Sequence, residues 1–118
     1  MRTHHNLRAW KLGMQLVEDV YQLTKGFPLA EQYGLTSQMR RAAVSVPSNI
    51  AEGAARESVA EFIRFLIIAR GSLSELETQC LLAQRLGFSR SLEDLFGIIE
   101  QVFAQLGGLI NSLKNRSA

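Results

Sequence analysis

The sequence predicts an all-α protein, an antiparallel up-down four-helix bundle with a proline-bent second helix, forming one domain over residues 1–118. Apolar residues recur at helical spacing in four segments, which are expected to form helices over about 7–25, 35–53, 58–86 and 91–114. Short connections between the last three segments favour neighbouring helices that run in opposite directions. With 47% hydrophobic and 20% charged residues, the chain has the composition of a globular protein.

The first segment is amphipathic and has a clear end. An apolar face is expected from four residues at helical spacing: Trp10, Met14, Val17 and Tyr21. The range 26–28 then holds a glycine, which suits a helix cap, and a proline, which cannot continue the helix.

The second segment carries a proline in its interior. Its apolar residues are expected to face the core: Met39, Ala43, Val46 and Ile50. Pro47 lacks the backbone N–H that would bond the carbonyl of Ala43, and its ring clashes with the preceding turn. Because the apolar spacing stays in phase across Pro47, we predict a bent helix rather than a loop between two helices.

Pro47 stands within a polar stripe that is formed by Arg41, Ser45, Ser48, Asn49 and Glu52. One interpretation is a ligand or nucleic-acid site. The other, which the pattern favours, is structural. Hydroxyl and amide groups would bond the carbonyl that Pro47 leaves free, and Glu52 would pair with an arginine such as Arg41, either on a helix or across a subunit contact.

The third and fourth segments carry the clearest helix signals. Ser58 followed by Glu61 matches a capping box, and Ser91 is a good N-cap. Steps of four and three give the third segment a heptad seam: Phe62, Leu66, Ala69, Leu73, Leu76, Cys80 and Ala83. The fourth segment continues this spacing: Leu92, Leu95, Ile99, Val102, Leu106, Leu109 and Leu113. A second apolar row at Phe65 and Ile68 exceeds what one bundle covers and predicts self-association.

The residue inventory argues against an enzyme, and no catalytic residue, metal or cofactor is predicted. His4 and His5 are adjacent in an N-terminus expected to fray, and helical neighbours do not face each other. Cys80 lies in the seam and is expected to be a small buried apolar residue rather than a nucleophile. The most apolar segment, 62–69, is too short to cross a bilayer. A single cysteine and the lack of a signal-peptide pattern favour a cytoplasmic protein without a membrane partner.

The sequence also resembles a known family. The run RRAAVSVPSNIAEG at 40–53, followed by IARGSLSELET at 68–78, is similar to the four-helix-bundle proteins encoded within intervening sequences of bacterial 23S ribosomal RNA genes. Trp10 and LTKGFPLAEQYGL at 23–35 extend the similarity over about residues 7–109. A relative in this family, the accessory variability determinant of diversity-generating retroelements, forms a homopentamer and works with a reverse transcriptase and nucleic acid. The resemblance therefore implies a homopentamer and brings no catalytic residues.

Two functional interpretations remain. The first is an oligomeric accessory protein that binds RNA or DNA through a basic surface and acts with a nucleic-acid-processing protein. The formal charge is only +2, but three basic residues have no acid close by in sequence and are expected to contact phosphates: Arg8, Lys11 and Arg40. Reversing the charge of Arg40 is expected to weaken binding and leave the melting temperature near wild type. The alternative is a protein-interaction or structural adaptor with no nucleic-acid role.

Overall fold

A computed structural model describes residues 2–89 and 91–117, and it consists of helices joined by short connections. The four α-helices are α1 (Arg8–Thr24), α2 (Leu35–Ala54), α3 (Val59–Arg85) and α4 (Glu93–Ser117). Two short 3₁₀ helices precede α1 and α2, η1 (Thr3–Asn6) and η2 (Leu29–Glu31). The described residues contain no strand, so the predicted all-helical class is confirmed.

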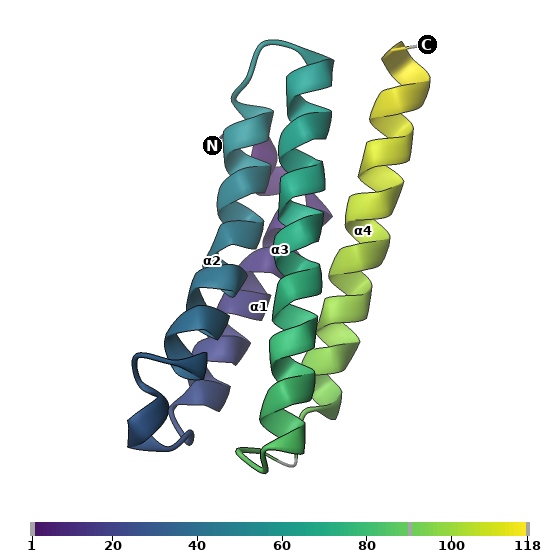
Figure 1. The fold of residues 1–118 in the computed structure, drawn as a ribbon. Helices are drawn as coiled ribbons and strands as arrows, with labels where there is room; N and C mark the ends of the chain where they lie inside the picture. Colours follow the sequence, from purple (N-terminus) through teal and green to yellow (C-terminus); the bar gives the residue numbers. More distant parts are fainter. Residues whose placement is uncertain (1, 90, 118) are drawn as a thin grey trace.

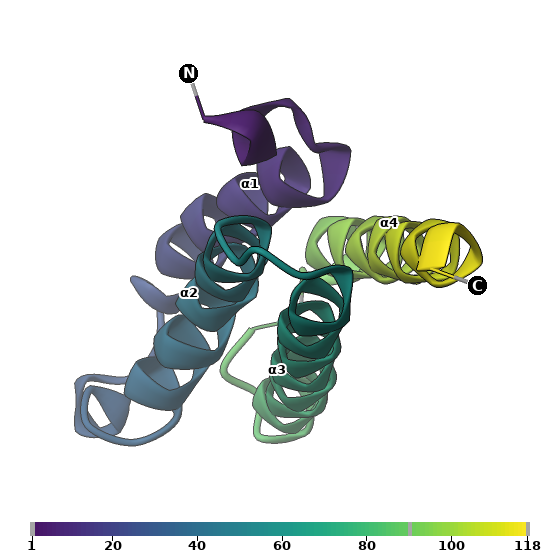
Figure 2. The same cartoon turned by 90° about the horizontal axis from the view of Figure 1, so that it is seen from above.

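Successive helices are joined at alternate ends of an elongated bundle, as Figure 1 shows. The bundle measures 47 × 21 × 21 Å. Each helix packs against two others: α2 contacts α1 and α3, and α4 contacts α3 and α1. In the view from above, α4 is inclined away from the other three helices (Figure 2). Along the described chain, no helix combines the length and the apolarity that a membrane crossing requires.

The core lies along the apolar faces predicted for the second, third and fourth segments. Every position predicted there is buried except Phe62 and Leu109, which are half-buried. Ile110 is buried beside Leu109, so the apolar face of α4 shifts by one residue near its C-terminal end. Fully buried leucines such as Leu73 and Leu106, with 0% of their surface exposed, carry the hydrophobic stabilisation.

The face predicted for the first helix was wrong in part: Trp10 and Val17 are half-buried against the core, but Met14 and Tyr21 are not. Met14 is 43% exposed and Tyr21 is 40% exposed. The buried residues of α1 lie on the adjacent face: Ala9, Gly13, Leu16, Val20 and Thr24. A Cβ atom built on Gly13 would lie 3.3 Å from the Cβ of Pro47, so α1 approaches α2 through a residue without a side chain. Because glycine contributes no apolar signal to a helical pattern, the pattern selected the larger residues on the neighbouring face.

Helix α2 passes through Pro47 without interruption, so no loop separates its two halves. Pro47 itself is buried against α1. The bend of the helix axis stays a prediction. Further along α2, Gly53 lies so close to α3 that an added Cβ would be only 2.6 Å from the Cβ of Phe65. The contact between α2 and α3 is the most extensive in the bundle.

The start of α3 forms one half of the predicted capping box. The Oγ of Ser58 accepts a hydrogen bond from the backbone N–H of Glu61 at 3.1 Å. The Glu61 carboxylate does not return to the Ser58 backbone; it accepts a bond from Arg64 at 2.9 Å, and this pairing lowers the pKa of Glu61. Arg64 therefore takes the acceptor that a complete capping box would use.

Candidate functional site

The polar stripe near Pro47 is divided between several roles: Ser45 joins α2 to α3, and Asn49 bonds to Ser45 within α2. The hydroxyls of Ser45 and Ser72 lie 2.8 Å apart and share a hydrogen bond across the two helices. The Nδ2 of Asn49 donates to the carbonyl of Ser45 at 2.8 Å and to its Oγ at 2.9 Å. The Asn49 amide thus bonds the carbonyl of Ser45. The sequence had predicted a bond to the carbonyl of Ala43, two residues earlier. These contacts are structural, but none of the described side-chain hydrogen bonds reaches the carbonyl of Ala43, as the structural interpretation had required.

Glu52 pairs with an arginine, but the partner is Arg56. Their side chains form an ion pair of 3.2 Å one turn apart at the end of α2, and both are largely exposed. Arg41 lies eleven residues before Glu52, about 16 Å along a continuous helix, which is beyond the reach of the two side chains. Arg41 and Ser48 are exposed, and Arg41 forms no hydrogen bond or ion pair with any described residue.

Arg40 fastens α2 to the end of α1. Its Nε donates to the Oγ of Thr24 at 2.8 Å, and its guanidinium lies 4.5 Å from the centroid of the Tyr21 ring. The Thr24 hydroxyl in turn donates to the carbonyl of Val20 at 2.8 Å. Because Arg40 is half-buried in this network, reversing its charge should also destabilise the contact between the helices, contrary to the expectation of an unchanged melting temperature.

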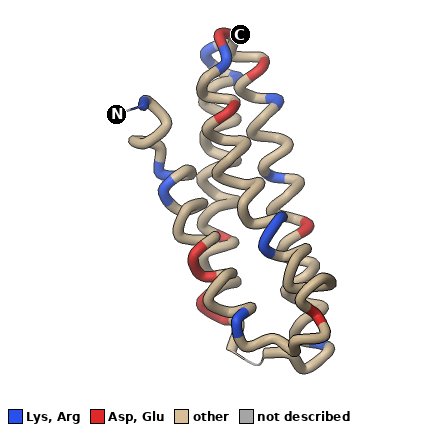
Figure 3. Tube along the Cα trace, turned by 90° about the vertical axis from the view of Figure 1, so that its left-hand side faces the viewer, with Lys and Arg blue, Asp and Glu red and all other residues tan. Residues whose placement is uncertain are grey.

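The structure brings Arg8 and Lys11 together but separates them from Arg40. Both lie exposed in the first turn of α1. Thr24, which Arg40 contacts, is sixteen residues beyond Arg8, or about 24 Å along the helix. Figure 3 shows basic segments near the N-terminus and acidic segments further along the chain. The three predicted phosphate contacts therefore do not form one patch on a single subunit.

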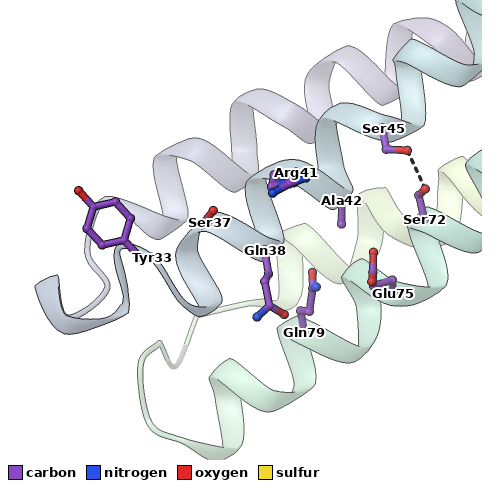
Figure 4. Close-up of a pocket in the computed structure, with 9 residues that line it drawn as sticks. All are labelled: Tyr33, Ser37, Gln38, Arg41, Ala42, Ser45, Ser72, Glu75 and Gln79. Atoms are coloured by element: carbon purple, nitrogen blue, oxygen red, sulfur yellow. Dashed lines mark hydrogen bonds between the residues drawn. The ribbon is translucent and has the colours of Figure 1, made fainter.

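A polar groove of about 450 Å³ lies between α2 and α3 (Figure 4). Two rows of residues with matching spacing face each other across it: Gln38, Arg41 and Ser45 on α2, and Ser72, Glu75 and Gln79 on α3. Its remaining lining residues are Tyr33, Ser37 and Ala42. The hydrogen bond between Ser45 and Ser72 closes one end of the groove, and Tyr33 stands at the other end.

Gln79 is the unusual member of this groove. Only 6% of its surface is exposed, and its Oε1 has no hydrogen-bond partner among the described residues. Buried polar groups are nearly always paired in folded proteins, because an unpaired one loses its bonds to water and gains none in return. An amide kept in this state marks a position where a bound molecule could supply the missing donor.

Sequence reasoning missed most of this groove. It identified Arg41 and Ser45 but followed the stripe along α2 to Glu52 and did not consider the facing row on α3. A signal was present, since Ser72, Glu75 and Gln79 follow steps of three and four beside the heptad seam. Two polar rows of equal spacing on successive helices indicate a polar contact between them.

The cysteine and the histidines have structural surroundings. Burial, with a smaller contribution from Glu77, raises the pKa of the Cys80 thiol to about 12, so the thiol stays protonated. His4 and His5 lie in a 3₁₀ turn with ring centroids 5.3 and 4.8 Å from that of Trp10, and fraying of this segment stays a prediction. Burial and the neighbouring His5 and Arg2 lower the pKa of His4. Within the described residues, no group of three or more His, Cys, Asp or Glu side chains could hold a metal ion.

These features define a class, an all-helical four-helix bundle with a polar groove between its second and third helices. The chain belongs to the family of 23S rRNA-intervening sequence proteins, whose family model matches residues 5–110. The resemblance seen in the sequence is therefore confirmed at the level of the family. No curated protein matches the sequence.

Proposed function

We propose that this protein is a non-enzymatic cytoplasmic accessory protein that assembles into a closed homo-oligomer and binds RNA or DNA through its phosphates. The observation that supports binding most directly is the start of α1. Arg8 and Lys11 are exposed there, form no ion pair with any described residue, and precede the first acid of the chain, Glu18. Such groups are available to replace the counterions that surround a nucleic acid.

The outward face of α3 supports self-association. Ile67 and Ile68 are 41% and 40% exposed, and Leu81 and Leu82, two heptads further along, are each 46% exposed. Gly71 lies between these pairs, with open space where a side chain would be. A glycine in the middle of an exposed helix costs about 1 kcal/mol relative to alanine, which suits a position that another helix approaches closely. The resemblance supports a pentamer.

Assembly also explains how a weakly charged chain could bind a polyanion. One subunit of net charge +2 can neutralise few phosphates, so its affinity alone is low and falls only modestly with salt. A ring repeats Arg8 and Lys11 on each subunit. After the first contact, further contacts along the same strand become intramolecular and the affinities combine.

Light scattering tests the assembly. The wild-type protein should have the mass of a closed oligomer at micromolar concentration, and Ile68→Glu should yield folded monomers because a charge would be placed in the apolar contact. Gln101→Glu, an exposed substitution on α4, is the matched control and should leave the mass unchanged. A wild-type monomer would contradict the proposal.

A salt series with structured RNA and duplex DNA tests binding. Wild-type protein should bind at ~50 mM salt, and affinity should fall at least tenfold by ~200 mM if several phosphates are contacted. Replacing both Arg8 and Lys11 with Glu should weaken binding to all sequences alike, whereas Lys25→Glu at the other end of α1 should have a smaller effect. An intact oligomer that binds neither polyanion would favour the alternative, a protein-interaction adaptor.

A further inference from the structure

We propose that the groove between α2 and α3 binds one unpaired nucleotide of a single-stranded nucleic acid, and that guanine is the base that fits it best. This inference rests on the proposed function, that the chain binds nucleic acid. Arg8 and Lys11 would contact phosphates, and the groove would be a second site that selects the base. Three of the lining side chains, Arg41, Glu75 and Gln79, form no hydrogen bond with any described residue.

The α3 side of the groove offers acceptors. Glu75 is exposed and forms no hydrogen bond or ion pair with a described residue, and Gln79 lies one turn further along with its unpaired Oε1. Guanine presents two adjacent N–H donors on its Watson–Crick edge, at N1 and at the exocyclic N2, which match the two oxygens of a carboxylate. The second N2 proton is then available for Gln79. Uracil offers a single donor on this edge, N3–H, flanked by two carbonyl oxygens that the Glu75 carboxylate repels.

The buried amide can adjust to the ligand. Rotation about the last torsion of Gln79 exchanges its oxygen and nitrogen, so either a donor or an acceptor can face the groove. In the free protein one of these groups stays unpaired, and a bound base removes that cost. The groove should therefore prefer a base that completes these bonds, because a base that does not would leave the same groups buried and unpaired.

The α2 side and the open end supply the other two contacts that a nucleotide needs. Arg41 lines the groove from α2, whereas Glu75 and Gln79 line it from α3 (Figure 4). Its guanidinium is unpaired among the described residues and can bind a phosphate through two parallel N–H bonds. Tyr33 is 89% exposed, so its ring is available for a base to stack on. A space of about 450 Å³ lies in the range of small-molecule sites.

The test compares two labelled five-nucleotide RNAs, UUGUU and UUUUU, by fluorescence anisotropy at low salt. We expect UUGUU to bind roughly tenfold more tightly, the effect of one good bidentate base contact. Glu75→Gln should abolish this preference without lowering the affinity for UUUUU, because the substitution removes a carboxylate that repels uracil. The matched control is Glu77→Gln, which lies two residues away on the same helix and outside the groove, and it should retain the preference.

Tyr33 provides a second, independent arm. Tyr33→Ala should weaken binding of UUGUU roughly tenfold through loss of stacking, and Tyr33→Phe should retain the affinity because it keeps the ring. Leu29→Ala removes another large exposed side chain of the same connection outside the groove and should have no effect. Since Tyr33 and Glu75 are exposed, these variants are expected to fold.

The outcomes separate this site from the proposed function. If the protein binds both RNAs equally, or if the Glu75 and Tyr33 variants behave like wild type, the groove site is overturned while phosphate binding stands. If no RNA or DNA binds at low salt, the proposed function fails first. If the groove variants change the oligomeric mass and not the base preference, the groove is a contact between subunits and the inference is wrong.

Discussion

Buried Gln79 and half-buried Arg40 differ in whether their polar groups have partners. Arg40 has a hydrogen bond to Thr24 and an aromatic ring beneath it, so its charge is used to join two helices. Gln79 is more deeply buried and leaves its oxygen unpaired. One should therefore contribute to the stability of the free protein and the other should reduce it.

Replacing Gln79 with Met should stabilise the protein. Methionine has a similar length and flexibility, and it removes the buried unpaired amide, whose desolvation costs about 1–3 kcal/mol. We expect the melting temperature followed by circular dichroism to rise by several degrees. Gln84→Met, at an exposed position of α3, should change it little. A clear fall for Gln79→Met would mean that the amide has a partner.

Replacing Arg40 with Met should destabilise the protein by about 1–2 kcal/mol. The substitution keeps the apolar stem but removes the bond to Thr24 and the cation–π contact with Tyr21. Arg41→Met on the next position serves as the control and should be nearly neutral, since Arg41 has no partner among the described residues. Urea denaturation of the two variants gives the comparison, and equal midpoints would show that the Arg40 network contributes nothing.

The sequence predicted which residues near Pro47 are polar but not their partners. Hydrogen bonds within the same helix follow from spacing, as in the pairs formed by Asn49 with Ser45 and by Arg56 with Glu52. Bonds between helices, such as Ser45 with Ser72, depend on how the two helices are rotated and how closely they approach. That rotation is set by packing, so the groove around Gln79 became visible only with the fold.

At the scale of the helices, large apolar residues were reliable guides and small residues were not. The seams of α3 and α4 were predicted nearly residue by residue because leucine, isoleucine and valine dominate them. The buried face of α1 was missed because it includes Gly13 and Thr24, which do not read as apolar. A helix that packs through small residues approaches its neighbour closely, and its pattern then indicates the wrong face.

The seam of α3 is tested by Leu73→Asp. Leu73 has none of its surface exposed, so the substitution would bury an unpaired charge and should cost several kcal/mol. The expected result is loss of the cooperative thermal transition. Ser74→Asp, on the adjacent exposed position, should melt near the wild-type temperature. A folded Leu73→Asp protein with unchanged melting would show that the seam is not in the core.

Two glycines should respond in opposite directions to the same substitution. Gly53→Ala would place a Cβ 2.6 Å from that of Phe65, which forces α2 and α3 apart and should cost about 1–3 kcal/mol. Gly97→Ala adds a methyl group to α4 where nothing lies within 4 Å, and should stabilise the helix by up to about 1 kcal/mol. Denaturant titration distinguishes the two, and a neutral Gly53→Ala would mean that the close contact is easily relieved.

At the scale of the whole molecule, the four helices are not equally embedded. The contact between α2 and α3 is the most extensive, with hydroxyl and glycine contacts added to the apolar core. The contacts of α4 with α1 and α3 are each smaller, and α4 is inclined away from the rest (Figure 2). Its sequence also contains three glycines, at 97, 107 and 108.

The unequal attachment of α4 predicts the order in which the native protein opens. If α4 detaches before the other helices separate, its backbone amides should exchange with deuterium at a lower opening free energy than those in the middle of α2 and α3. Exchange measured by mass spectrometry on peptides from 93–117 and 39–50 would report this directly. Identical protection in both peptides would mean that the bundle opens only as one unit. With α4 detached, the hydrophobic residues that it covers on α1 and α3 become accessible to another copy, so the same opening offers a route by which a fourth helix could be exchanged between subunits.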